Sequence, residues 1–103
     1  MKYLVISKRN TLIAPSTKEW LAMLQATNEL AIAWLEDGTI ECSYGTVPAD
    51  GGMTIVNADS HEQAQEVLTK IPLFPFYTWT IQPVIEMLSI YDRFIELYKQ
   101  QIG

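Results

Sequence analysis

The order of patterns along this sequence predicts an α+β fold with a four-stranded sheet and three helices. Four segments have the continuous or alternating apolar pattern of strands, and three longer segments have apolar residues at helical spacing. They follow one another as β-α-β-β-α-β-α. The first six are two β-α-β halves, which is the ferredoxin-like βαββαβ arrangement, and the last is an extra C-terminal helix. The 103 residues are enough for one domain, 1–103.

The first strand and the first helix have the clearest local signals. Residues 2–8 contain a continuous apolar run, as expected of a strand that is buried on both faces. Ser16, with Glu19 three residues later, has the spacing of a capping box. We therefore expect a helix from there to about Glu36, closed by Gly38 in a left-handed cap.

The middle of the chain predicts a hairpin followed by a short helix. Residues 39–46 and 53–58 alternate as strands do, and the segment 47–52 between them is rich in turn-forming residues. Ser60, with Gln63 three residues later, predicts the start of a helix that ends near Ile71.

A stiff, apolar connection joins that helix to the last strand. Two prolines exclude regular helix from residues 71–76, and the apolar residues between them predict that the connection packs against the core, a pocket or a partner. Residues 76–82 alternate as a fourth strand, which we expect Pro83 to break. Residues 84–101 then have a wide apolar stripe at helical spacing.

Composition and charge exclude several classes of partner. The net charge is −5 and no basic cluster is present, which argues against a nucleic acid and against an anionic membrane surface. One cysteine and one histidine make none of the usual metal-ligand sets, so we expect no metal. The single Cys42 cannot form an internal disulfide, and a cytoplasmic location is the simplest interpretation.

The low proportion of charge predicts a homo-oligomer. Hydrophobic residues make up 49% of the chain and charged residues only 18%. All four strands carry apolar residues on both faces, so the sheet face opposite the helices also needs cover. Two sheets packed face to face would supply it, giving a dimeric α+β barrel or a multiple of such dimers. A monomer with an exposed sheet is the alternative.

Residues 71–77, Ile-Pro-Leu-Phe-Pro-Phe-Tyr, resemble the "LPLFPY" segment before the final strand of muconolactone isomerases. The opening strand Met1–Ser7 and the passage Leu35–Ile40 are similar to the same family, and the likeness covers most of residues 1–83. The resemblance implies a ferredoxin-like fold, a dimer-based oligomer, and proton transfer within a small unsaturated lactone without a cofactor. The strand 39–46 departs from the family because it has no Arg or His to hold a lactone carboxylate.

Glu41, Tyr44 and His61 are the candidate catalytic residues. Glu41, if it lies on the inner face of its strand, would be desolvated and would act as a base. Tyr44, or alternatively Tyr77 or Tyr3, would hold an enolate oxygen, and a neutral His61 would assist. The simpler interpretations are a solvent-facing Glu41 and an ordinary solvated His61 at the first turn of a helix.

A small apolar ligand is the other expectation. A pocket between the first helix and the sheet would be lined by aromatic residues, for which the candidates are Trp34, Phe74, Tyr77 and Trp79. Each tryptophan is more simply explained as core. Alternation places Cys42 with Ile40 and Tyr44 on an apolar face, where a buried, inert thiol is expected. Three functions therefore remain open: a proton-transfer enzyme, a binding module without catalysis, and a structural subunit.

Overall fold

The computed structural model of the chain describes residues 1–47 and 50–103 and has the predicted element order. The sheet has the strand order β2-β3-β1-β4, and every neighbouring pair is antiparallel. The ferredoxin-like fold with an extra C-terminal helix is therefore confirmed. The predicted turn over 47–52 includes Pro48 and Ala49, which lie outside the described residues. The elements are β1 (Lys2–Arg9), α1 (Thr17–Asp37), β2 (Ile40–Gly45), β3 (Gly51–Asn57), α2 (His61–Thr69), the 3₁₀ turn η1 (Phe74–Phe76), β4 (Tyr77–Val84) and α3 (Met87–Ile102).

The two helix starts have the predicted caps. The Ser16 hydroxyl oxygen accepts a hydrogen bond from the Glu19 backbone N–H at 3.2 Å and donates to the Glu19 carboxylate at 2.9 Å. Ser60 accepts from the backbone N–H of Gln63 at 3.1 Å. These bonds satisfy N–H groups that have no partner inside the helix.

The end of α1 is fixed by three consecutive residues. Gly38 takes a φ of 82°, the left-handed conformation that a side chain disfavours. Thr39 then donates two hydrogen bonds to the Asp37 carboxylate, from its hydroxyl at 2.6 Å and from its backbone N–H at 2.8 Å. These bonds favour the ionised form, so the pKa of Asp37 lies below its usual value of 3.8.

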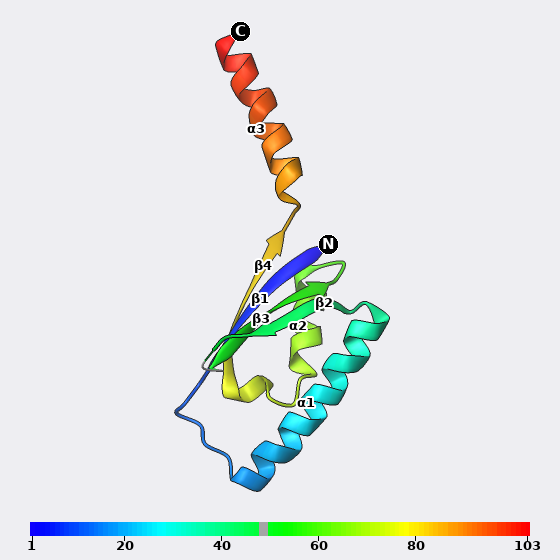
Figure 1. The fold of residues 1–103 in the computed structure, drawn as a ribbon, viewed down its shortest axis with the longest axis vertical. Coiled ribbons are helices and arrows are strands. Elements are labelled where there is room, and N and C mark those ends of the chain that lie inside the picture. The colour runs from blue at the N-terminus through cyan, green and yellow to red at the C-terminus, as the bar shows by residue number, and fades with distance from the viewer. Residues whose placement is uncertain (48–49) are drawn as a thin grey trace.

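Helices α1 and α2 cover the same face of the sheet (Figure 1). The centre of this layer is a set of almost inaccessible side chains from β1, β2, β3, α2 and the residue after β3, and partly buried aromatic residues pack against it. The buried residues of this cluster are Tyr3, Val5, Ile40, Val56, Ala58, Ala64 and Leu68. Helix α2 contributes two of them, whereas α1 has no buried residue at all. Helix α1 therefore packs more loosely on the sheet than α2 does.

Strand β2 contains an irregularity that overturns one prediction. Its register shifts between Ile40, which lies opposite Val56 of the buried face, and Cys42, which lies opposite Ile55 of the outer face. The expectation that Ile40 and Cys42 share a face is therefore wrong. A β-bulge adds one residue to the strand, and one added residue reverses which side chains face the core. Cys42 is half-buried rather than buried.

The proline-rich connection packs within its own chain, as one of the predicted alternatives had it. Leu73 is buried, and the Phe74 ring stacks on Trp79 with centroids 5.7 Å apart. The Trp79 indole N–H donates to the Phe74 carbonyl oxygen at 3.0 Å, and Phe76 meets Trp20 edge to face. The connection thus joins α1 to the start of β4.

Pro83 does not break the last strand, contrary to prediction. Strand β4 continues through it to Val84 and α3 begins only at Met87. Since β4 is an edge strand, the missing N–H of a proline costs the sheet no hydrogen bond on its open side.

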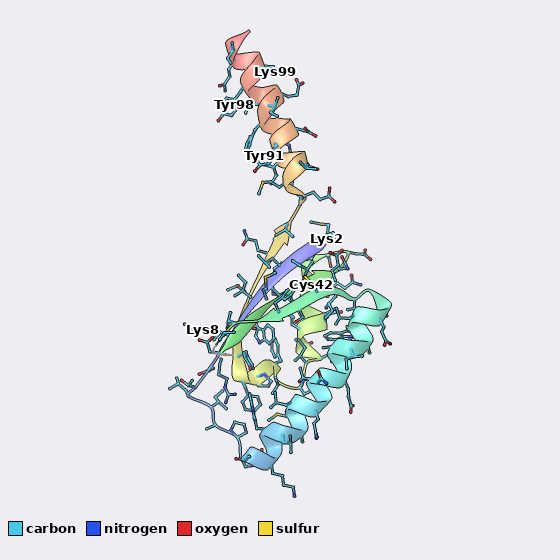
Figure 2. The ribbon with its side chains drawn as sticks, in the orientation of Figure 1. Lys2, Lys8, Cys42, Tyr91, Tyr98 and Lys99 are labelled. Atoms are coloured by element: carbon cyan, nitrogen blue, oxygen red, sulfur yellow. The ribbon has the colours of Figure 1, made fainter. Side chains whose placement is uncertain are left out.

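Helix α3 stands clear of the rest of the chain. It continues in the direction of β4, and the molecule measures 66 × 29 × 23 Å as a result (Figure 1). Figure 2 shows Tyr91 and Tyr98 extending from α3 far from the labelled sheet residues Lys2, Lys8 and Cys42. No residue of α3 is buried, although half of its circumference is apolar. In the described part of the chain, no helix is long and apolar enough to cross a membrane.

Candidate functional site

A half-open cavity of about 230 Å³ lies between α1, the inner face of the sheet and α2. It is a consequence of small residues on β2 and β3. One cross-strand row on the inner face contains Gly45, Gly52 and Ser7, and the next contains Ser43 and Thr54. Side chains of this size cannot reach the loosely packed α1, so space remains between the two layers.

The cavity wall is mainly apolar, and three of the four predicted ligand-binding residues belong to it. Trp34 of α1 and Tyr77 and Trp79 of β4 all line it. Phe74 does not line it. Instead the Phe74 ring stacks on the Trp79 ring, and Phe74 lines a second hollow together with Gln65 and Ile81. The structure therefore brings together residues that are 43 to 45 positions apart in the sequence.

Hydroxyl groups are the main polar side-chain groups of the wall. The hydroxyl oxygen of Thr27, on α1, is inaccessible to solvent and has no hydrogen-bond partner. Across the cavity, the hydroxyls of Ser43 and Thr54 bond to each other at 2.9 Å. The Ser7 hydroxyl donates to the Gly52 carbonyl oxygen at 3.4 Å. These groups allow the site to bind oxygen atoms of a ligand without supplying a charge.

The three predicted catalytic residues do not form one cluster at the cavity. Tyr44 belongs to the strand that borders the cavity, but it lies opposite Met53 of the outer face and its side chain is 65% exposed. Glu41 does not line it, and its carboxylate forms an ion pair with Lys2, with 42% of the side chain exposed. Glu41 was expected to be a desolvated base only if it lay on the inner face, and in one copy of the chain its position beside Lys2 outside the cavity does not meet that condition.

His61 is the exposed first residue of α2 and lies outside the cavity wall. Its ring contacts the edge of the buried Tyr3, with centroids 6.0 Å apart. His61 therefore takes part in the packing between the start of α2 and β1. Elsewhere in residues 1–47 and 50–103, no group of three acidic, histidine or cysteine side chains is placed to hold a metal ion.

Thr27, Ser43 and Thr54 are the site residues that sequence reasoning missed. Ser43 was assigned to the face opposite Ile40, and without the bulge the alternation rule makes that assignment correct. Thr27 lies seven residues after Trp20 and seven before Trp34, a helical spacing that indicates a packing residue rather than a ligand-binding one. The available signal was the accumulation of Gly, Ser and Thr at inward strand positions, which predicts unfilled space.

Arg9 is a further residue near the site that the sequence did not single out. It lies opposite Tyr77 in the β1–β4 register, and its guanidinium stacks on the Trp20 ring with its carbon 3.8 Å from the ring centroid. It also donates to the Ile13 carbonyl oxygen at 3.3 Å. Arg9 therefore holds the loop between β1 and α1 against the start of the helix, and it does not line the cavity.

Comparison with known proteins supports the fold. No family profile matches this chain, and no curated protein matches it in sequence. Among solved structures, the chain is similar to the crystal structure of muconolactone isomerase, with a TM-score of 0.74 over 84% of this chain and 90% of that one. The sequences are 16% identical across this match. The likeness confirms the muconolactone isomerase-like fold that the proline-rich segment predicted, and it establishes the fold alone.

Proposed function

We propose that this protein binds a small, largely apolar molecule in the cavity beneath α1. The observation that carries the proposal is the cavity itself, which is lined by Trp34, Tyr77 and Trp79 and contains the unpartnered Thr27 hydroxyl. Binding sites are characteristically apolar concavities with a few convergent polar groups. An apolar cavity of roughly 150 Å³ holds one benzene ring, so 230 Å³ suits a single substituted ring.

Binding is tested by titrating the full chain with a five-membered unsaturated lactone. Two of the three tryptophans line the cavity, so ligand entry changes the intrinsic fluorescence. At a ligand concentration of about 100 times Kd, Tm rises by roughly 10 °C or more. No change in fluorescence or Tm at millimolar concentrations of lactones and small aromatic compounds would remove the proposal.

A second candidate function is cofactor-independent proton transfer within an unsaturated lactone-like ring. The fold shared with muconolactone isomerase favours it. In this reaction a base removes a proton from a ring carbon, a phenol hydroxyl stabilises the enolate oxygen, and the proton returns at another carbon. Tyr44 or Tyr77 would serve as the phenol, Glu41 as the base and His61 as an assistant.

The reaction is separated from simple binding by NMR in D₂O. An enzyme exchanges the acidic ring proton of the lactone for deuterium and converts one double-bond isomer into the other. Glu41→Gln then abolishes exchange while the Tm stays near that of the wild type. Exchange at the wild-type rate in Glu41→Gln would contradict the role of Glu41, and binding without exchange would identify a binding module.

We further propose that the protein is a homodimer, or a multiple of dimers, in which the outer faces of two sheets meet. The outer face is apolar and uncovered in one copy. Its apolar residues are Leu4, Ile6, Cys42, Tyr44, Met53 and Ile55. Helix α3 adds three aromatic residues that are about half exposed, Tyr91, Phe94 and Tyr98, and these offer further apolar surface to a second copy. The free thiol of Cys42 fits a reducing compartment such as the cytoplasm.

Light scattering of the full chain at micromolar concentration tests this assembly. Ile6→Lys places a charge on the outer face and is expected to shift the protein towards monomers. Leu12→Lys is the matched control, because Leu12 lies in the loop after β1 and is already 92% exposed. A wild-type monomer at this concentration would remove the proposal.

A further inference from the structure

The cavity wall carries no ionised side chain. Among the described residues that line it there is no Asp, Glu, His, Lys or Arg. A carboxylate that enters a largely apolar cavity loses its hydration and gains no opposite charge in return. The wall therefore disfavours an anionic ligand.

Two cations of β1 make contacts away from the cavity. Lys2 pairs with Glu41 away from the cavity wall. Arg9 lies on the inner face beyond Ser7, where its guanidinium stacks on Trp20 and donates to the Ile13 carbonyl oxygen; its Nε is buried without a partner, and the residue does not line the cavity. Neither cation is placed to neutralise a carboxylate in the cavity.

Hydroxyl groups are what the cavity offers to a polar ligand atom. A threonine hydroxyl on a helix ordinarily bonds back to the carbonyl oxygen one turn earlier. The Thr27 hydroxyl makes no such bond, and its oxygen is closed off from solvent in the ligand-free chain, so it reaches a ligand oxygen only when the side chain turns towards the cavity. In the Ser43–Thr54 pair one hydroxyl uses its proton on the other, which leaves the second proton available.

We infer that the cavity selects an uncharged ring with one or two carbonyl or ether oxygens, such as a lactone, a cyclic enone or a quinone, and discriminates against the same ring bearing a free carboxylate. The inference rests on the proposed binding function and specifies its ligand class. The ring occupies the apolar part of the cavity between Trp34 and Trp79. Its oxygen atoms accept hydrogen bonds from Thr27 and from the Ser43–Thr54 pair.

A matched ligand pair tests this inference. The two ligands are an unsaturated γ-lactone with an acetamide side chain and the same lactone with an acetate side chain, which have nearly the same shape and differ in charge at pH 7. Calorimetric titration of the full chain is expected to give a Kd at least roughly tenfold lower for the amide. Equal or tighter binding of the acetate would overturn the inference while leaving the binding function intact. Failure of both to bind at millimolar concentration would overturn the binding function and the inference with it.

Thr27 variants locate the discriminating contact. Thr27→Val removes the hydroxyl at nearly constant shape and is expected to weaken amide binding roughly threefold to tenfold, whereas Thr27→Ser keeps the hydroxyl and restores most of the affinity. Thr17→Val, at the exposed start of the same helix, leaves affinity unchanged. Ser43→Ala provides a second removal, should Thr27→Val lower the Tm. Wild-type affinity in both hydroxyl-removing variants would overturn the role of these groups.

Discussion

Filling the cavity from α1 is expected to stabilise the ligand-free protein and to prevent binding. Ala31 lies on α1, is half-buried and lines the cavity. Ala31→Leu adds three carbon atoms that project into empty space rather than into packed side chains. Ala33 lies on the same helix, is exposed and does not line the cavity, so Ala33→Leu is the matched control.

The magnitude follows from the area that the new side chain removes from water. Three buried carbons contribute about 2.4 kcal/mol at ~0.8 kcal/mol each, and the half-buried position reduces this to about 1 kcal/mol. For a domain of this size, the Tm rises by roughly 4–8 °C. The change in helix propensity from Ala to Leu is common to both variants, so it cancels in their difference.

Urea denaturation and ligand titration measure the two effects. We expect Ala31→Leu to have a higher free energy of unfolding than Ala33→Leu and to bind lactone or aromatic ligands at least tenfold more weakly than the wild type. A lower free energy of unfolding in Ala31→Leu would mean that the space is already filled, because overpacking a dense core destabilises it. That result would refute the cavity and the binding function that depends on it.

Two further predictions concern the sheet and the end of α1. A Cβ at Gly51 would collide with the Ser7 carbonyl oxygen, whereas a Cβ at Gly45 would have its nearest atom 3.7 Å away. In urea denaturation we therefore expect Gly51→Ala to lower the free energy of unfolding by about 1–3 kcal/mol and Gly45→Ala to change it little. Equal unfolding midpoints for the two variants would contradict this. The lowered pKa of Asp37 means that its ionised form stabilises the fold above pH 3.8, and this contribution is lost as the pH falls through the lowered value. The difference in free energy of unfolding between the wild type and Asp37→Asn therefore shrinks in acid. A difference that does not change with pH would exclude a stabilising role for the ionised Asp37 carboxylate.

Local signals predicted most of the fold. The caps at Ser16 and Ser60 and the left-handed Gly38 depend on residues within three positions of each other, and all three were correctly placed. Pro83 was misjudged as a strand breaker because its effect depends on which strand lies at the sheet edge. Edge position is a property of the whole sheet.

The candidate site was predicted only in part. The aromatic wall formed by Trp34, Tyr77 and Trp79 follows from apolar patterns that face a shared core. The hydroxyl groups of Ser43 and Thr54 escaped prediction because a single bulged residue changed the face to which Ser43 belongs. Glu41 lies beside Lys2 and outside the cavity, and the sequence pattern had left its face open.

The sequence by itself determined the element order, the capped starts of α1 and α2 and the apolar character of both sheet faces, since each of these follows from local spacing and composition. Only the tertiary structure decided that a cavity exists, because empty space depends on the fit of α1 to rows of small residues from three different strands. It also decided which hydroxyls enter that cavity and that α3 leaves the body of the chain. Such outcomes depend on packing between distant segments, and local periodicity carries no information about it.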